Sequence, residues 1–157
     1  MILSVTRLRL RSWRFVLSFL RENERVVTQL CAAEGFLGGE VVAKAGLVFW
    51  TVSRWTSPRA MARFAHDGAH GAVIPKLAGW CSEASTVTFA VDGERPITPA
   101  EIATRLRERG RVVAVDRPSE AQRRGERARP DDQPAGLLRR PLAPRARRPD
   151  GRLPYSA

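Results

Sequence analysis

Apolar and polar positions along the first part of the chain recur with two different periods, and each change of period marks a predicted element. In ILSVTRLRL (2–10), Leu8 and Leu10 alternate with arginines, which is the two-residue period of a half-buried strand. From Ser12 the apolar positions recur every three or four residues. This spacing predicts a two-faced helix that ends near Gly35, where glycine can adopt the left-handed conformation.

Two further apolar runs, FLGGEVVAK (36–44) and GLVFWTVSRW (46–55), predict a β-hairpin after this helix. The second run is apolar on both faces, with Phe49 on one and Trp50 on the other. In a chain this small we expect helices to cover one face of such a strand. A partner subunit is the simplest cover for the other face.

The next helical region is interrupted. In WTSPRAMARFAHDG, Thr56 or Ser57 is expected to cap a helix that stops at Asp67-Gly68. A second helical piece, AHGAVIPKLAGWC (69–81), contains Pro75, which either kinks the helix or begins its last turns.

The segment SEASTVTFAV (82–91) predicts a fourth strand and completes the order β-α-β-β-α-β. This order is that of a ferredoxin-like α+β fold, an antiparallel sheet with both helices on one face. A further helix is expected to start at Thr98-Pro99 and to stop at Gly110, and RVVAV (111–115) predicts a fifth strand. Residues 1–118 are therefore expected to form one domain.

Residues 119–157 differ in composition from the rest of the chain. From residue 121 onward ten arginines face four acidic residues, so the segment carries +6 of the net charge of +11 and six of the eleven prolines. Such a segment buries too little apolar surface to offset the entropy of ordering it, so we expect a disordered tail. Its arginines are of the kind that bind nucleic acid or lipid headgroups. A solvated extension is the favoured interpretation, and nucleic acid is not an expected partner.

Several classes of function find no support in the sequence. The two cysteines, Cys31 and Cys81, make no disulfide framework, and no Cys/His cluster has zinc spacing. Arginines interrupt the apolar positions of the N-terminal segment, so we expect neither a secretory signal nor a transmembrane segment, and a cytoplasmic location. GFLGGE lacks the residues of a phosphate-binding loop.

The run WTSPRAMARFAHDGAHGAVIPKL (55–77) resembles the antibiotic-biosynthesis-monooxygenase-like superfamily. FAHDGAHGAVIPKLAGWCSEAS (64–85) is similar to its spheroidene-monooxygenase-like proteins and their uncharacterised relatives, in which Gly-Ala-His, a Pro and Trp-Cys-x-Glu-Ala-Ser recur. The resemblance covers about residues 1–118. It implies a homodimeric α/β barrel, in which two four-stranded sheets face each other, with a cavity between sheet and helices in each subunit. Such cavities serve cofactor-free oxygenation of aromatic polyketides, haem chemistry, or no known activity, so fold alone does not settle function.

His70 is the first candidate for chemistry, as an acid–base group or a haem ligand. In the haem-degrading relatives the ligand lies one helical turn later, where Val73 or Ile74 stands here, and this departure counts against haem. The alternative is that His70 packs at a helix junction with its ring bonded to a backbone carbonyl. His66 lies four residues earlier, but Asp67-Gly68 is expected to break the helix between them, so we predict no metal site.

Glu83 is the second catalytic candidate, as a general base, although it can instead accept hydrogen bonds from Arg54 or Arg63. Large aromatic rings favour a pocket for a flat substrate, but at strand and helix spacing they are also typical of core. The leading hypothesis is a monooxygenase-like protein acting on a small apolar, aromatic or polyene substrate, with haem or no cofactor. Its pocket is expected to be lined by Trp50, Phe64, His66 and Trp80. The alternatives are a non-catalytic protein that binds a small ligand, and a nucleic-acid binder that uses the basic tail.

Overall fold

Six strands, paired antiparallel throughout, make one sheet in the computed structural model, which describes residues 1–93, 96–136 and 138–145. Their order across the sheet is β5-β4-β1-β3-β2-β6. The strands are β1 (Ile2–Leu10), β2 (Phe36–Lys44), β3 (Val48–Trp55), β4 (Cys81–Ala90), β5 (Arg111–Val112) and β6 (Leu138–Leu142). The four central strands have the ferredoxin-like order, as predicted.

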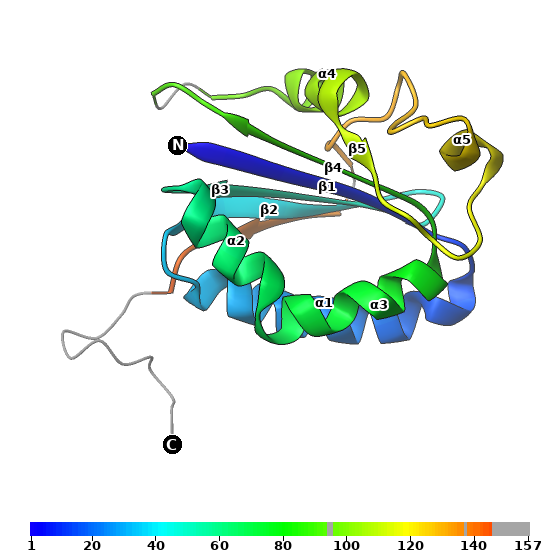
Figure 1. Ribbon diagram of the computed structural model, residues 1–157, viewed down its shortest axis with the longest axis horizontal. Coiled ribbons are helices and arrows are strands. Elements are labelled where there is room, and N and C mark those ends of the chain that lie inside the picture. Colours follow the sequence, from blue (N-terminus) through cyan, green and yellow to red (C-terminus); the bar gives the residue numbers. More distant parts are fainter. Residues whose placement is uncertain (94–95, 137, 146–157) are drawn as a thin grey trace.

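Helices cover both faces of this sheet (Figure 1). On one face lie the short η1 (Trp13–Phe15) and the helices α1 (Val16–Ala32), α2 (Pro58–His66) and α3 (Gly68–Trp80). On the other face lie α4 (Pro99–Arg109), α5 (Glu120–Arg123) and the loops that follow them. We call residues 97–136 the C-terminal cover.

The predicted helix boundaries follow from their capping residues. Ser57 accepts a hydrogen bond from the backbone N–H of Ala60 and begins α2. Asp67 ends α2 and precedes α3, so the predicted break is confirmed. Thr98 caps α4 in the same way as Ser57 caps α2. Pro75 lies inside the continuous helix α3, so it does not begin a separate turn.

The second face of β3 is buried by the same chain and not by a partner subunit. Trp50 and Val52 share a core cluster with Ile102 and Leu106 of α4, and Trp50 is 0% exposed. Our inference that another subunit covers this face was therefore wrong. Two such sheets cannot face each other as in a dimeric barrel while the C-terminal cover is in place, and the sheet is open. A homodimer through another surface stays a prediction.

The disordered tail predicted for residues 119–157 is also wrong over its described part, residues 119–136 and 138–145. This part contains α5 and β6, and β6 pairs with β2 from Gly39↔Leu142 to Ala43↔Leu138. The prediction failed because it treated arginine as solvated. Arg139 is paired with Glu40 and Arg140 with Glu24, so both arginines hold β6 in place. Residues 146–157 lie outside the described residues.

Two smaller points complete the fold. The predicted strand at 111–115 is only two residues long, and one further backbone hydrogen bond joins the N–H of Val113 to the carbonyl oxygen of Ala84 on β4. No helix in the described part of the chain is long and apolar enough to cross a membrane.

Gly39 of β2 packs closely against β3, opposite Ser53. A Cβ atom at this position would overlap the carbonyl oxygen of Val52, which is part of the backbone and cannot rotate away. We expect Gly39→Ala to lower the free energy of unfolding by about 1–3 kcal/mol, measured by urea denaturation. The control is Gly79→Ala, where the nearest atom beyond the neighbouring residues is 3.6 Å away. Equal midpoints for the two variants would contradict the close packing of β2 on β3.

Candidate functional site

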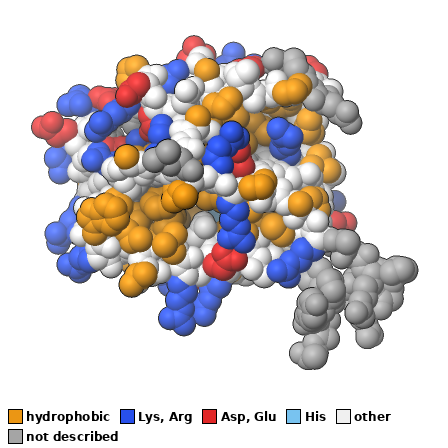
Figure 2. Space-filling model, turned by 180° about the vertical axis from the view of Figure 1, so that it is seen from behind, with side chains coloured by type: hydrophobic (Ala, Val, Ile, Leu, Met, Phe, Trp, Pro, Cys, Tyr) orange, Lys and Arg blue, Asp and Glu red, His pale blue; other side chains and the backbone are white. Residues whose placement is uncertain are grey.

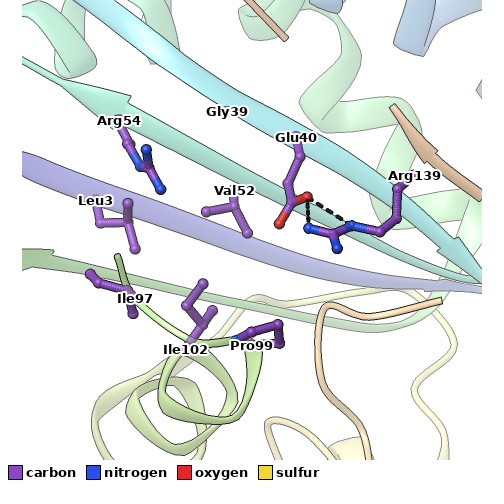
Figure 3. Close-up of a pocket in the computed structure, with 9 residues that line it drawn as sticks. All are labelled: Leu3, Gly39, Glu40, Val52, Arg54, Ile97, Pro99, Ile102 and Arg139. Atoms are coloured by element: carbon purple, nitrogen blue, oxygen red, sulfur yellow. Dashed lines mark hydrogen bonds and ion pairs between the residues drawn. The ribbon is translucent and has the colours of Figure 1, made fainter. Parts of the chain in front are cut away.

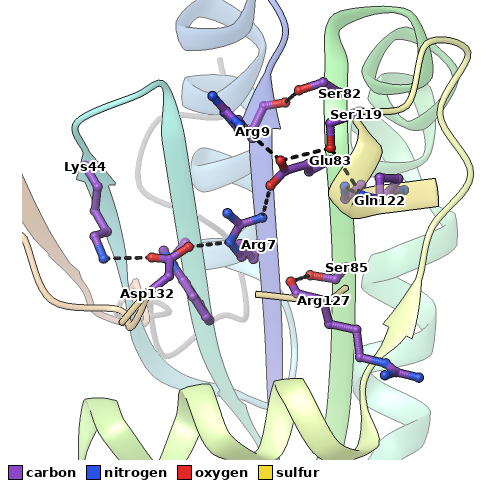
Figure 4. Close-up of polar contacts among 12 residues, drawn as sticks. Arg7, Arg9, Lys44, Ser82, Glu83, Ser85, Ser119, Gln122, Arg127 and Asp132 are labelled. Atoms are coloured by element: carbon purple, nitrogen blue, oxygen red, sulfur yellow. Dashed lines mark hydrogen bonds and ion pairs between the residues drawn. The ribbon is translucent and has the colours of Figure 1, made fainter. Parts of the chain in front are cut away.

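A buried arginine lies at the centre of the polar contacts between the sheet and the C-terminal cover (Figure 4). Arg7 of β1 is 3% exposed and donates from Nη1 to Oε2 of Glu83 on β4, at 2.7 Å. Its Nε donates to Oδ2 of Asp132 in the cover. The guanidinium thus joins strands β1 and β4 to a loop of the C-terminal cover that is distant in sequence. Both carboxylates are buried.

Each of these carboxylates has further donors. Lys44 Nζ lies 2.7 Å and Trp50 Nε1 3.1 Å from Oδ1 of Asp132. Oε1 of Glu83 accepts from Arg9 Nη1 at 3.1 Å and from the Ser119 hydroxyl at 3.0 Å. The seven residues joined by these bonds are called the Arg7 network: Arg7, Arg9, Lys44, Trp50, Glu83, Ser119 and Asp132. No buried side-chain nitrogen or oxygen among the described residues lacks a partner.

The Arg7 network holds both carboxylates in the ionised form. Burial by itself raises the pKa of Glu83, but hydrogen bonds from Arg7, Arg9 and Ser119 outweigh burial, so the pKa is lowered. The same balance, with Lys44 and Arg7 as donors, lowers the pKa of Asp132. A carboxylate held by two guanidinium groups is a weak proton acceptor. The contacts of Glu83 therefore favour a role in holding the fold over the general-base role.

A cleft of about 210 Å³ opens between the sheet and the start of α4 (Figure 3). Its apolar lining comes from β1, β3 and the α4 region: Leu3, Val52, Ile97, Pro99 and Ile102. Its polar lining is Arg54 of β3 together with Glu40 and Arg139, which pair with each other across β2 and β6. Arg54 is exposed and makes no ion pair with any described residue. We call this space the α4 cleft.

A second cleft, of about 180 Å³, lies at the opposite end of the same sheet face. Its lining is mostly charged and contains Arg7, Arg9, Lys44, Arg129, Asp131 and Asp132. Arg7, Lys44 and Asp132 already satisfy one another in the Arg7 network. The two charged lining residues outside this network, Arg129 and Asp131, have opposite signs and add no net charge to this cleft.

His70 and Phe64 lie on the other face of the sheet, where α2 meets α3. The Nδ1 atom of His70 is 2.8 Å from the carbonyl oxygen of Ala65, and the ring centroid is 4.7 Å from that of Phe64. Since a carbonyl only accepts, Nδ1 carries the proton and Nε2 the lone pair. Burial lowers the pKa of His70, although the bond to Ala65 opposes this shift. These are the contacts that the packing interpretation of His70 predicts.

The remaining predicted site residues are dispersed. Trp80 ends α3 and stacks on Phe15, at 6.4 Å between centroids. His66 is exposed at the end of α2. Cys81 is buried, and burial raises the pKa of its thiol to about 12, so it is an unreactive thiol near neutral pH. No group of three metal-ligating side chains lies together in the described part of the chain.

The structure thus brings together Trp50 and Glu83 on one face of the sheet, and Phe64 and His70 on the other. It does not gather the predicted residues into one pocket, and none of them lines the α4 cleft. His70 supplies a nitrogen that could bind haem iron, but neither cleft borders it, so neither offers a porphyrin a slot beside that ligand. The residues present do not fit haem.

Sequence reasoning missed Arg7 and Asp132, and it considered Arg54 only as a partner for Glu83, whose arginine partners are Arg7 and Arg9. The strand pattern does indicate that Arg7 is buried, because Arg7 shares a face with the apolar Leu3 and Val5 and not with Leu8. A charged side chain on the apolar face of a strand needs a buried partner. The partner, Asp132, could not be found in this way, since it lies in a segment without apolar periodicity.

Comparison with known proteins supports the fold. No family model matches the chain, and no curated protein matches its sequence. Among solved structures, a putative antibiotic biosynthesis monooxygenase from Nitrosomonas europaea is similar over 59% of this chain and 100% of its own, with 11% identity and a TM-score of 0.54. Rv0793 from Mycobacterium tuberculosis covers 60% of this chain and 98% of its own, with 15% identity and a TM-score of 0.53.

A third solved structure is that of SnoaB, a cofactor-independent oxygenase from Streptomyces nogalater. It covers 61% of this chain and 97% of its own, with 13% identity and a TM-score of 0.50. The chain therefore has the ferredoxin-like fold of antibiotic-biosynthesis-monooxygenase-like proteins, as the sequence resemblance implied. At these identities the likeness concerns the fold, and it does not single out the spheroidene-monooxygenase-like group.

Proposed function

We propose that the protein binds a small apolar acid in the α4 cleft, as a ligand-binding protein of this fold. The observation that carries the proposal is the exposed Arg54 guanidinium beside an apolar wall of Leu3, Val52 and Ile102. Glu40 is neutralised by Arg139, so Arg54 leaves the lining with one positive charge in excess. An arginine fork is suited to a carboxylate, and an apolar wall is suited to the body of the ligand.

The size of the α4 cleft restricts the ligand. Its volume of about 210 Å³ is below the range of roughly 300–1,000 Å³ typical of sites for drug-sized ligands. A single aromatic ring with one acidic group is the expected scale, and a long polyene is not. For a ligand of this size we expect a Kd on the order of 1 mM.

The test is a titration of the full chain with benzoate, followed by ligand-observed NMR, with benzamide as the uncharged ligand of the same shape. Benzoate is expected to bind more tightly than benzamide, and Arg54→Gln to weaken benzoate binding by about tenfold or more. The matched control is Arg109→Gln, which removes an exposed arginine at the far end of α4. Equal affinity of the Arg54→Gln variant and the unmodified chain would refute the proposal.

A second candidate function is cofactor-free oxygenation of the bound molecule. It is favoured by the likeness to SnoaB in fold and by the carboxylate of Glu40 in the lining of the α4 cleft. In such a reaction an activated methylene and dioxygen give a ketone and water, so that the substrate supplies all the electrons. Oε1 of Glu40 would take the proton from the methylene, because Arg139 bonds only Oε2, and Arg54 would stabilise the enolate.

Oxygen uptake separates the two functions. Indane-1,3-dione is a suitable probe, because its methylene lies between two carbonyl groups and its ring system is small. Uptake that both Glu40→Gln and Arg54→Gln abolish would support oxygenation. Binding of benzoate without uptake would support ligand binding alone.

A further inference from the structure

An apolar stripe runs along the exposed side of η1 and α1. Trp13 is 76% exposed, Leu17 82% and Leu20 46%. Their spacing of four and three residues places them above one another on one side of the helix. This side faces away from α3, because α3 contacts α1 at Glu22 through Lys76. Leaving three large apolar side chains so exposed on one stripe is costly in water.

Strand β6 extends this stripe across the edge of the sheet. Leu142 of β6 packs in a cluster with Val27 and Leu30 of α1, and Arg140 pairs with Glu24 one helical turn earlier. Because side chains alternate along a strand, Leu138 lies on the same face of β6 as Arg140 and Leu142. Leu138 is 71% exposed. Figure 2, seen from behind, shows apolar side chains gathered at the lower left, where α1 lies in front.

We call Trp13, Leu17, Leu20 and Leu138 the α1–β6 patch. Arginines surround it: Arg14, Arg21 and Arg140 are all exposed. The neighbouring acidic side chain, Glu24, is already paired with Arg140. Arg14 and Arg21 make no ion pair with any described residue, so the rim of the patch carries a net positive charge.

We propose that the α1–β6 patch docks the protein on an anionic lipid surface. The indole of Trp13 is suited to the headgroup level, the leucines to the acyl boundary below it, and the arginine rim to acidic headgroups. A second copy of the chain is a poorer occupant. Two patches placed face to face bring their arginine rims together, and like charges at close range repel. The proposal is independent of the α4 cleft, which lies on the other face of the sheet.

The experiment measures intrinsic tryptophan fluorescence of the full chain with vesicles of phosphatidylcholine, with or without phosphatidylglycerol. Trp50 and Trp55 are 0% exposed and Trp80 is half-buried, so a blue shift reports chiefly on Trp13. We expect a blue shift and co-sedimentation with vesicles that contain phosphatidylglycerol. Trp13→Phe should remove the shift but keep most of the co-sedimentation, which assigns the signal to Trp13.

Further variants test how the apolar and the charged residues of the α1–β6 patch contribute to vesicle binding. Leu17→Ser is expected to lower vesicle partitioning by roughly tenfold, whereas Ile74→Ser, at 46% exposure on α3, should leave it unchanged. Replacing both Arg14 and Arg21 with glutamine should weaken binding to phosphatidylglycerol vesicles, as should added salt. Binding that is the same with and without phosphatidylglycerol would overturn the proposal. So would a dimer in sedimentation velocity that Leu17→Ser converts to monomer, since the patch would then serve self-association.

Discussion

Replacing Arg7 with alanine is expected to destabilise the protein by about 3–5 kcal/mol, because it leaves two buried carboxylates without their shared cation. Glu83 keeps Arg9 and Ser119, and Asp132 keeps Lys44 and Trp50, but neither retains the buried guanidinium that joins the sheet to the C-terminal cover. The loss is measured as the free energy of unfolding in urea.

The control for this variant is Arg9→Ala. The side chain of Arg9 is 34% exposed and contacts only the outer oxygen of Glu83, so its loss should cost less than about 1 kcal/mol. Replacing Arg7, Glu83 and Asp132 together by uncharged residues should recover part of the stability that Arg7→Ala loses, since no unpaired charge remains. Arg7→Ala with a cost no greater than that of Arg9→Ala would contradict the central position of Arg7.

The same residues give stability a defined dependence on pH. The pKa values of Glu83 and Asp132 are lowered in the folded state, so these groups contribute stability above their unfolded pKa values, at about 4.3 and 3.9. That contribution is lost as the pH falls through the lowered folded values. Acid should therefore destabilise the unmodified chain, and the Arg7→Ala variant should show a shallower dependence over the same range.

A chain that ends at residue 118 is expected to lose cooperative unfolding. The cut removes Gln122, whose side chain bonds Ala84 N–H and the carbonyl of Val113, as well as Asp132 and β6. It also uncovers part of the core around Trp50, which is fully buried in the intact chain. Thermal unfolding followed by circular dichroism is the measurement, and a broad or absent transition is the expected result.

A chain that ends at residue 145 is the matched control. It keeps every described element, and its midpoint should equal that of the full chain. A 118-residue chain with an unchanged midpoint would show that residues 119–145 add nothing to stability. A well-folded dimer of the shorter chain would show instead that a second copy can take the place of the removed part of the cover.

The central fold was predictable because each of its elements has a recognisable local sequence pattern. β1, β3 and β4 have apolar periodicity, and Ser57, Asp67-Gly68 and Thr98 mark helix ends by their side-chain and backbone chemistry. β6 has no such pattern. Its sequence, LRRPL, is charged and contains proline. It forms a strand because β2 offers an unpaired edge, and because Glu40 of β2 and Glu24 of α1 pair with its arginines. Such a strand is fixed by tertiary contacts alone.

The candidate site was predicted less well than the fold. The sequence search followed histidine and tryptophan, which have distinctive chemistry, and placed His70 and Trp80 in one pocket with Trp50. In the structure Trp50 lies on the opposite face of the sheet from His70, because the side chains of a strand alternate. Arg54 was considered only as a partner for Glu83. Its position at the α4 cleft depends on α4 packing over this face of the sheet, which no local pattern reveals.

The C-terminal cover also changes how the sheet depends on the amount of protein present. A face closed by a second subunit opens on dilution, because association follows mass action. Here the C-terminal cover belongs to the same chain as the sheet, so its effective concentration is set by the length of the connecting segment. That concentration is the same in a dilute cell extract as in a concentrated sample. This face of the sheet therefore stays covered at any expression level.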